Sequence, residues 1–405
     1  MIYDKILELL QKKNDDEAKI LCKKVKRRLK NDQKVDVIKS AVRFDCVMTL
    51  DYMIDTIHDG FDNMDCAAEY DSVKIMEYYS EHIGLGYGNN SAIQIACAYG
   101  SVNMVKFLLS SDEVDPTVDD NIPLMLACKN NHVEIVELLL ADDRIDPLAD
   151  NTYAFMLTIS CGYTELFELL INDRRVILSN ISDRLVLCAS TEGSGEIMRI
   201  LLKHECVDPT IRNNRPIRAA CYVGNVETAI ELLSHKAVDP TVKNNYPLRF
   251  ACSGGHLKLV KKLLENKNVN PSAKDNDGFR WALRNGYLDI VRSLMSNERF
   301  DPSLNDSYAL WCACYNGYAD IVKDLIRDER VDPTDENNRC IVTAWERNNV
   351  EVMQVLLKDH RVVKGLIEFN IITTKPEYDS DTDSDFEFYV AHKGIDSDDE
   401  LSDVN

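Results

Sequence analysis

Apolar residues recur along this chain in short groups with helical spacing, and the whole arrangement repeats every 31 residues. In the unit that begins at Asp115, Leu124 and Ala127 share one face of a first helix, and Val133 starts the apolar stripe of a second. Pro123 fits the first turn of the first helix, where a proline costs no hydrogen bond. Each unit is therefore predicted to be a pair of helices.

Turn and break signals separate the helices. An Asp-Pro or Asn-Pro pair opens the unit, and the Asp or Asn residues after it tolerate the left-handed conformation. Between the two helices stands a glycine, or an asparagine in two units, as a left-handed helix end requires. The opening pairs begin at Asp115, Asp146, Asp208, Asp239, Asn270, Asp301 and Asp332. The register predicts nine units, which begin at residues 84, 115, 146, 177, 208, 239, 270, 301 and 332.

This unit resembles the ankyrin repeat, a β-turn followed by two antiparallel helices. The family's Thr-Pro-Leu-His pattern corresponds here to Ile122-Pro123-Leu124-Met125, and its Gly-His pair to Gly255-His256. The resemblance implies an all-α ankyrin-repeat solenoid in which stacked units share one core. The 31-residue period differs from the family's usual length of about 33 and is similar to the ankyrin families of large DNA viruses of amoebae and of protists.

The register also divides the chain. Residues 1–34 are predicted to form a helical N-terminal cap, residues 35–83 about two degenerate repeats, and residues 84–365 the nine regular repeats. No helix is expected beyond Val363. Residues 366–405 are expected to be a disordered tail, because eleven acidic residues and one lysine follow residue 376.

Composition favours a folded protein in a reducing compartment. The net charge of -21 disfavours nucleic acid as the partner. The chain has 13 cysteines, an odd number, and no Cys-x-x-Cys motif. In five units a cysteine follows an alanine at the same repeat position, which indicates small core residues rather than disulfides. We expect no signal peptide at the charged N-terminus, and no apolar run is long enough to span a membrane. We expect a cytoplasmic monomer.

A basic cluster near the N-terminus offers a second location. Lys12-Lys13 and the cluster from Lys23 to Arg28 resemble a bipartite nuclear localisation signal. The same residues also suit the exposed face of the cap helix, so nuclear import is the alternative to the cytoplasm.

No group of residues has the pattern of an active site or a metal site. Cys312 and Cys314 would point in different directions on a helix and have no second pair of ligands. His132 and His256 fit the structural Gly-His position implied by the resemblance. We therefore expect no enzymatic activity, cofactor, metal ion or small-molecule substrate.

The charge of one loop position changes sign along the repeats. This tip position, just before the first helix, is occupied by Asp119, Asp150, Ile181, Arg212, Lys243, Lys274, Asn305 and Glu336. Three consecutive basic tips predict a groove beside the concave face of the solenoid that binds an acidic or phosphorylated segment. The alternative is a solvated run of charge.

Exposed positions near the tips complete the predicted site. The predicted partner-binding residues are Arg212, Arg215, Tyr222, Lys243, Lys274, Arg284 and Tyr315. Two further rows are assigned to the framework instead. Arg218, Arg249 and Arg280 are expected to brace neighbouring repeats, and Phe250 and Trp281 to fill an apolar position.

The acidic tail carries candidate phosphorylation sites. Ser380, Thr382, Ser384 and Ser397 each have an acidic residue three positions later, which resembles the sites of acidophilic kinases. The tail is expected either to compete with an external ligand for the basic groove or only to keep the chain soluble.

These patterns favour a non-enzymatic scaffold or adaptor with a protein partner. The alternative is a substrate receptor for a host ubiquitin ligase, which would need an F-box-like helical segment that the tail does not contain. A nucleic-acid-associated factor fits the charge least well.

Overall fold

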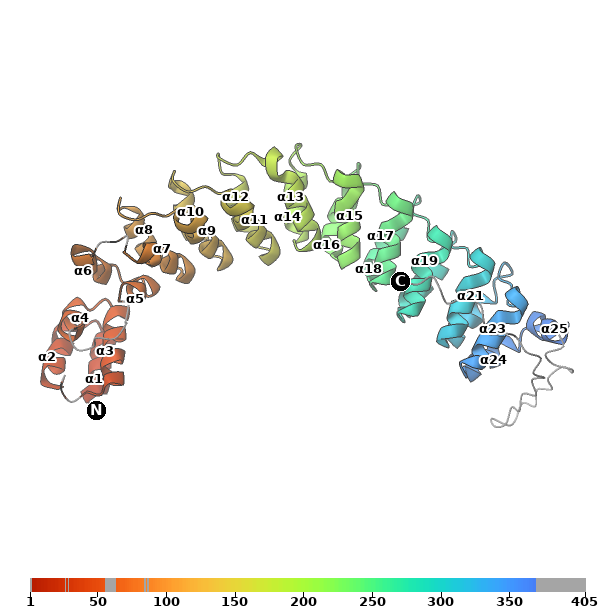
Figure 1. Cartoon of the computed structure of the whole chain (residues 1–405), viewed down its shortest axis with the longest axis horizontal. Coiled ribbons are helices and arrows are strands. Elements are labelled where there is room, and N and C mark those ends of the chain that lie inside the picture. Colours follow the sequence, from red (N-terminus) through yellow and green to blue (C-terminus); the bar gives the residue numbers. More distant parts are fainter. Residues whose placement is uncertain are drawn as a thin grey trace. The chain divides into compact units, whose positions relative to one another are not determined.

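The computed structural model describes residues 2–25, 27, 29–54, 63–83, 85 and 87–368. In these residues all regular structure is helical, as 25 helices, of which α1 to α24 follow one another in pairs (Figure 1). The chain divides into two compact units, which we call the N-terminal unit (Met1–Pro216) and the C-terminal unit (Ile217–Asn405). The predicted all-α repeat solenoid is confirmed.

We call the two members of each pair helix one and helix two. In the N-terminal unit, helix one is α1 (Ile2–Gln11), α3 (Asn31–Arg43), α5 (Asn63–Glu69), α7 (Tyr87–Tyr99), α9 (Val118–Lys129), α11 (Ala149–Cys161) and α13 (Leu178–Thr191). Helix two is α2 (Asp15–Val25), α4 (Val47–Ile54), α6 (Val73–Ile83), α8 (Val102–Leu109), α10 (Val133–Ala141), α12 (Thr164–Ile171) and α14 (Gly195–Leu202).

The division between the units falls inside α15 (Ile211–Val223), a helix one. The C-terminal unit continues with α16 (Val226–Ser234), α17 (Val242–Ser253), α18 (Leu257–Leu264), α19 (Ala273–Arg284), α20 (Leu288–Met295), α21 (Leu304–Asn316), α22 (Ala319–Leu325), α23 (Asp335–Glu346), α24 (Val350–Leu356) and α25 (His360–Glu368). Helix one packs on the next helix one, as in α17, α19 and α21, so each pair buries its apolar face against its neighbours.

A left-handed turn introduces helix one in most pairs. In α17, Lys243, Asn244 and Asn245 have φ angles of 48°, 62° and 57° before the right-handed helix starts. The third side chain is buried, and its Oδ1 accepts the backbone N–H of Asn270 at 2.8 Å. In the same way Asn121 accepts the N–H of Asp146 at 3.2 Å. The predicted left-handed turn is confirmed, and its third residue also ties one repeat to the next.

An Asp-x-Arg sequence after helix two makes a second contact between repeats. The Arg175 guanidinium pairs with Asp173 at 2.6 Å and donates to the backbone oxygens of Leu140, Asp142 and Ile145. These oxygens lie at and just beyond the end of α10, where helix carbonyls lack partners within the helix. Arg361 makes the same contact to Ile326 and Val331.

The ends of the repeat array differ from their predicted boundaries. α1 and α2 form a pair that packs on α3 and α4, and α3 begins inside the predicted cap of residues 1–34.

At the C-terminal end of the array, the expectation that no helix follows Val363 is wrong. α25 runs to Glu368, through the expected start of the tail at residue 366, and packs its buried Val362 and Leu366 beside α23. α25 is a single helix without a partner helix, so the 31-residue period did not predict it. The rest of the tail lies outside the described residues.

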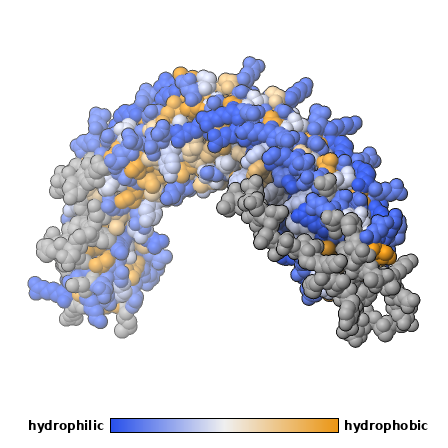
Figure 2. Space-filling view, turned by 45° about the vertical axis from the view of Figure 1, so that its right-hand side comes forward, coloured by the Kyte–Doolittle hydropathy of each residue, from blue (hydrophilic) through white to orange (hydrophobic). Residues whose placement is uncertain are grey.

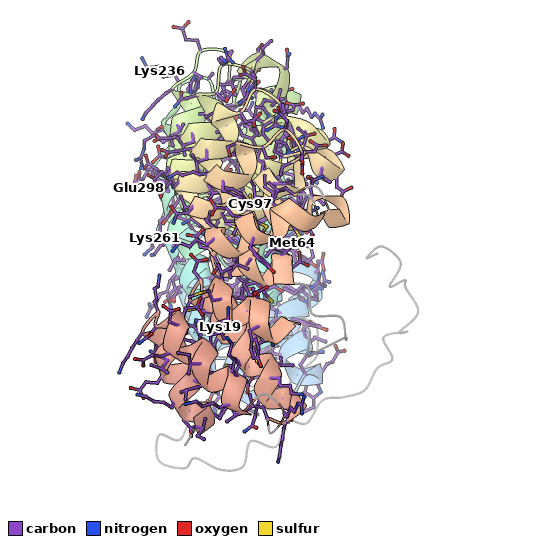
Figure 3. The ribbon with its side chains drawn as sticks, turned by 90° about the vertical axis from the view of Figure 1, so that its left-hand side faces the viewer. Lys19, Met64, Cys97, Lys236, Lys261 and Glu298 are labelled. Atoms are coloured by element: carbon purple, nitrogen blue, oxygen red, sulfur yellow. The ribbon has the colours of Figure 1, made fainter. Side chains whose placement is uncertain are left out.

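The predicted core cysteines are buried. Cys97, labelled in Figure 3, and Cys128, Cys221, Cys252 and Cys314 are all 0% exposed. Burial raises the pKa of the Cys128 thiol to about 12 and that of Cys221 further still. Cys161 and Cys206 are exposed.

Figure 2 shows a surface on which hydrophilic residues predominate, with apolar residues in small groups.

Thiol labelling tests this core. At pH 8 we expect an aromatic disulfide reagent to modify Cys161 and Cys206 in the native chain and Cys128 only after denaturation, because a buried thiol with a raised pKa forms little reactive thiolate. Mass spectrometry of labelled peptides identifies the sites. Native labelling of Cys128 as fast as Cys161 would contradict the packing.

Candidate functional site

The predicted tip residues occupy the first position of the left-handed turn. Arg212, Lys243 and Lys274 have φ angles of 49°, 48° and 51°, and their side chains are exposed. Lys243 and Lys274 lie in equivalent turns of the packed helices α17 and α19. Arg212 and Arg215 belong to the N-terminal unit, in the first half of α15. The structure thus brings together the two lysine tips of the C-terminal unit.

The other predicted residues lie at the far end of helix one. Tyr222 is 61% exposed, and its ring centroid is 5.7 Å from that of Phe250. The exposed Arg284 lies 5.5 Å over the Trp281 ring. Tyr315 is 39% exposed. The predicted site therefore splits into tips before helix one and side chains near its end.

Tyr222, Arg284 and Tyr315 belong to a larger surface that we call the arginine–aromatic face of the C-terminal unit. All of its residues are exposed or half-buried and lie on helix one or directly after it. Its guanidinium groups belong to Arg218, Arg249, Arg280, Arg284, Arg339 and Arg347. Its rings belong to Tyr222, Tyr246, Phe250, Trp281, Tyr308, Trp311 and Tyr315.

Guanidinium groups and rings of neighbouring repeats stack on this face. Arg218 lies 5.5 Å from the Tyr246 ring centroid, and Arg280 lies 5.0 Å from that of Tyr308. Arg339 lies 4.3 Å over Trp311. These distances fall within the range of cation–π attraction. Arg218 and Arg280 contact the next repeat, as their predicted bracing role requires.

Tyr315 and Arg347 form the end of the face. Arg347 lies 4.0 Å over Tyr315, and the Tyr315 ring is 5.3 Å from Trp311. Trp281 is 38% exposed, so its assignment to the apolar framework is wrong. The Arg284 guanidinium lies over the indole at 5.5 Å from the ring centroid.

Few carboxylates neutralise the face. Asp277 serves two guanidinium groups, Arg249 at 2.7 Å and Arg280 at 3.4 Å. Among the carboxylates that the structure describes, none forms an ion pair with Arg284 or Arg347. A guanidinium that lies flat on a ring keeps its in-plane N–H donors for a carboxylate or phosphate. The face can therefore accept acidic groups and apolar side chains together.

Sequence reasoning missed Trp311, Arg339 and Arg347. A usable signal was present, because Trp311 stands at the repeat position of Arg218, Arg249 and Arg280, and Tyr308 at that of Tyr246. Aligning the repeats by this period would have shown that rings and guanidinium groups alternate in the same rows.

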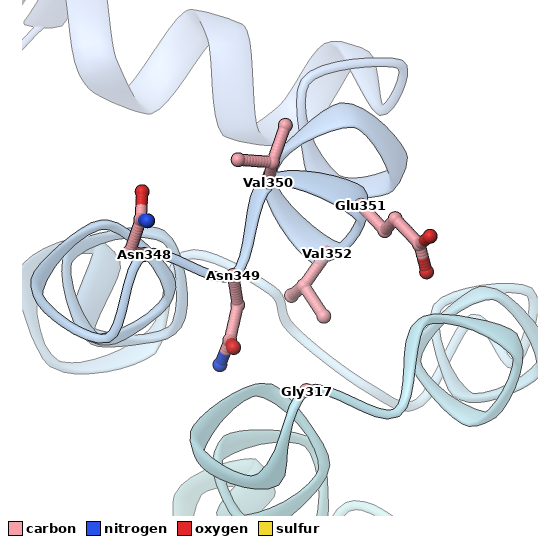
Figure 4. A pocket seen from close by; sticks show the side chains of 6 residues that line it. All are labelled: Gly317, Asn348, Asn349, Val350, Glu351 and Val352. Atoms are coloured by element: carbon pink, nitrogen blue, oxygen red, sulfur yellow. The ribbon is translucent and has the colours of Figure 1, made fainter.

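A depression of about 210 Å³ lies elsewhere in the C-terminal unit, at the start of α24 (Figure 4). Asn349 points from its wall toward Gly317 and donates to the Cys314 backbone oxygen at 2.9 Å. This side chain closes the contact between two repeats, so the depression is a feature of repeat packing.

Metal and membrane sites find no support in the described residues. They contain no cluster of three or more His, Cys, Asp or Glu side chains suited to a metal ion. Burial raises the pKa of Cys312 to about 11, which disfavours the thiolate that zinc requires. None of the described helices is long and apolar enough to cross a bilayer. The predicted phosphorylation sites Ser380, Thr382, Ser384 and Ser397, and Lys26 and Arg28 of the basic cluster, lie outside the described residues.

Comparison with known families gives one result. A family model for ankyrin repeats in three copies matches residues 64–151, 185–275, 217–306 and 279–366, which together are more than half of the chain. No curated protein is significantly similar in sequence.

Proposed function

The chain belongs to the ankyrin-repeat family, and from this premise we propose that it is a non-enzymatic adaptor that holds an acidic segment of a partner protein on the arginine–aromatic face. Ankyrin repeats are protein–protein interaction domains, and their families are generally non-enzymatic. To this general role the proposal adds the surface of the chain that binds the partner and the acidic chemistry of the bound segment.

One observation carries the proposal. Arg284 and Arg347 stack on Trp281 and Tyr315, and no described carboxylate pairs with either arginine. Exposed aromatic and arginine side chains dominate the binding energy of protein interfaces, because they combine a large apolar area with directed donors. Lys243 and Lys274 at the tips extend the same positive charge along the start of helix one.

Charge reversal tests this surface. We expect peptides selected by phage display against the full chain to combine acidic and aromatic residues, and Arg284→Glu/Arg347→Glu to weaken their binding more than tenfold. Fluorescence anisotropy at about 0.15 M salt measures this loss under moderate screening.

The matched control reverses the same charge on helix two. Arg292 and Arg327 are exposed and lie in α20 and just after α22. Arg292→Glu/Arg327→Glu should change affinity less than threefold. Equal loss in both variants would show a general effect of net charge, and selection of peptides without acidic residues would contradict the proposed partner chemistry.

Arginines and rings also suit single-stranded nucleic acid, where bases stack on aromatic side chains. The family favours a protein partner, so a fluorescein-labelled oligothymidine should bind far more weakly than the selected peptides. Tighter binding of the oligonucleotide would replace the proposal with the nucleic-acid alternative. The ubiquitin-ligase alternative has no feature in the described residues that favours it.

Location and lineage are supported by sequence alone. We propose a cytoplasmic protein, with the basic cluster from Lys23 to Arg28 as the route to the nucleus if it is imported. The 31-residue period supports kinship with the variant ankyrin families of large amoebal viruses and protists.

A further inference from the structure

We propose that residues 377–390 of this chain bind the arginine–aromatic face of the C-terminal unit and compete there with the partner. The inference rests on the proposed function in that both use the same surface. It goes further because it assigns a specific occupant from the same chain.

The segment has a strict alternation of charge. Its acidic residues stand at every second position, and the segment contains no lysine or arginine. They are Glu377, Asp379, Asp381, Asp383, Asp385 and Glu387. Alternate side chains of an extended strand point to the same side, so an extended segment would carry six carboxylates along one edge. Tyr378, Phe386 and Phe388 would lie along the other.

The face offers guanidinium groups on both sides of a group of rings. Arg280 and Arg284 come from α19, and Arg339 and Arg347 from the region of α23. Between them, α21 contributes three rings, with Trp311 at 4.9 Å from Tyr308 and 5.3 Å from Tyr315. An extended segment that crosses these helices meets guanidinium groups, then rings, then guanidinium groups. The carboxylate edge of the segment can therefore meet guanidinium groups at both ends of this crossing.

The extended segment is long enough to cross the three helices that carry the face. Packed helices lie about 10 Å apart, so α19, α21 and α23 span about 20 Å. Ten residue steps of extended chain from Glu377 to Glu387 span about 33 Å, enough to cross all three helices.

The segment can reach the face from its own attachment point. α25 ends at Glu368 and packs on α23. The eight residues 369–376 extend up to about 26 Å, more than two helix spacings. A tethered segment also has a local concentration of about a millimolar, so an external partner must displace it to bind.

Charge within the C-terminal unit directs the segment to this face. Residues 217–368 contain 21 basic and 21 acidic residues, so the unit as a whole has no net attraction for an acidic segment. Attraction depends on a local excess of positive charge. The face provides one, because Asp277 pairs with both Arg249 and Arg280, Glu336 pairs with Arg339, and no described carboxylate forms an ion pair with Arg284 or Arg347.

Phosphorylation would add charge along the opposite edge of the segment. Ser380, Thr382 and Ser384 lie within the segment, and each phosphate adds about -1.5 to -2 charges with acceptor oxygens for arginine. The same face would then hold a more acidic ligand.

The test uses the full chain with a neutralised segment, Asp379→Asn/Asp381→Asn/Asp383→Asn/Asp385→Asn. The probe is a fluorescein-labelled synthetic peptide of residues 375–392 added in trans. We expect the neutralised chain to bind this peptide at least tenfold more tightly than the unaltered chain, because its own segment no longer occupies the face. The control, Asp396→Asn/Asp398→Asn/Asp399→Asn/Glu400→Gln, removes four charges outside the segment and should leave the affinity unchanged.

Tryptophan fluorescence gives a second readout, because the three tryptophans, Trp281, Trp311 and Trp345, all lie in the C-terminal unit and two of them on the face. The emission of the unaltered and neutralised chains should differ at low salt and converge at about 1 M salt. A difference that depends on protein concentration would assign the contact to a second copy and overturn the inference.

The outcomes separate the two proposals. Equal peptide affinity in all three chains overturns the inference. If the displayed acidic peptides still bind the face in that case, the proposed function stands. If neither kind of peptide binds, both fail.

Discussion

Replacing Arg175 by alanine is expected to lower the free energy of unfolding by about 3 kcal/mol. The guanidinium is only partly exposed, pairs with Asp173 and donates to three backbone oxygens of the preceding repeat. Alanine leaves these oxygens and the Asp173 carboxylate without their donor. The loss appears as a lower midpoint in urea denaturation followed by circular dichroism.

The neighbouring arginine provides the control. Arg174 is 78% exposed and pairs with the equally exposed Asp143. Such surface pairs contribute little, so Arg174→Ala should change stability by less than about 0.5 kcal/mol. Similar losses for the two variants would show that the contacts of Arg175 with the preceding repeat do not stabilise the array.

The Arg175 contact also has a pH dependence. The hydrogen bonds from Arg175 lower the pKa of Asp173 below its ordinary value. The stabilisation from the Asp173–Arg175 pair is therefore fully present above about pH 4, the ordinary pKa range of an aspartate. It is lost as the pH falls through the lowered pKa of Asp173. The stability difference between the unaltered chain and Asp173→Asn should shrink over that acidic range.

Gly224→Ala is expected to cost about 3 kcal/mol, and Gly162→Ala only about 1 kcal/mol. Both glycines end helix one with positive φ, at 80° and 72°, so both substitutions force alanine into the left-handed region. A Cβ at Gly224 would also overlap the ring of His256, whereas nothing lies within 4 Å of one at Gly162. The difference between the two variants isolates the packing of the histidine.

Thermal or urea unfolding of the two alanine variants measures this difference. Equal destabilisation would mean that the His256 ring moves aside freely. A full loss at Gly224 would support the structural role that the Gly-His resemblance implies for this histidine.

Local features of the fold were predictable from the sequence. The repeat period, the paired helices and the left-handed turn at residues such as Asn244 follow from apolar spacing and from residues that tolerate positive φ. The sequence did not predict that Asn245 contacts the next repeat or that Arg175 contacts the preceding one. A repeat period shows that repeats stack but not which atoms meet.

The candidate site was predictable in part. Tyr222, Arg284 and Tyr315 are exposed, as expected, but the surface that joins their positions contains Trp311 and Arg347, which were not singled out. The row of Arg218, Arg249 and Arg280, which was assigned to contacts between repeats, continues with Trp311. Whether it is buried depends on the side chain that the adjacent repeat places beside it, and a single repeat does not contain that information.

The most direct test of the arginine–aromatic face is photo-crosslinking of a selected acidic peptide to the full chain, with the adducts mapped by mass spectrometry. We expect adducts on α19, α21 and α23, near Trp281, Trp311 and Tyr315. Adducts confined to helix two or to the tip turns would contradict the account.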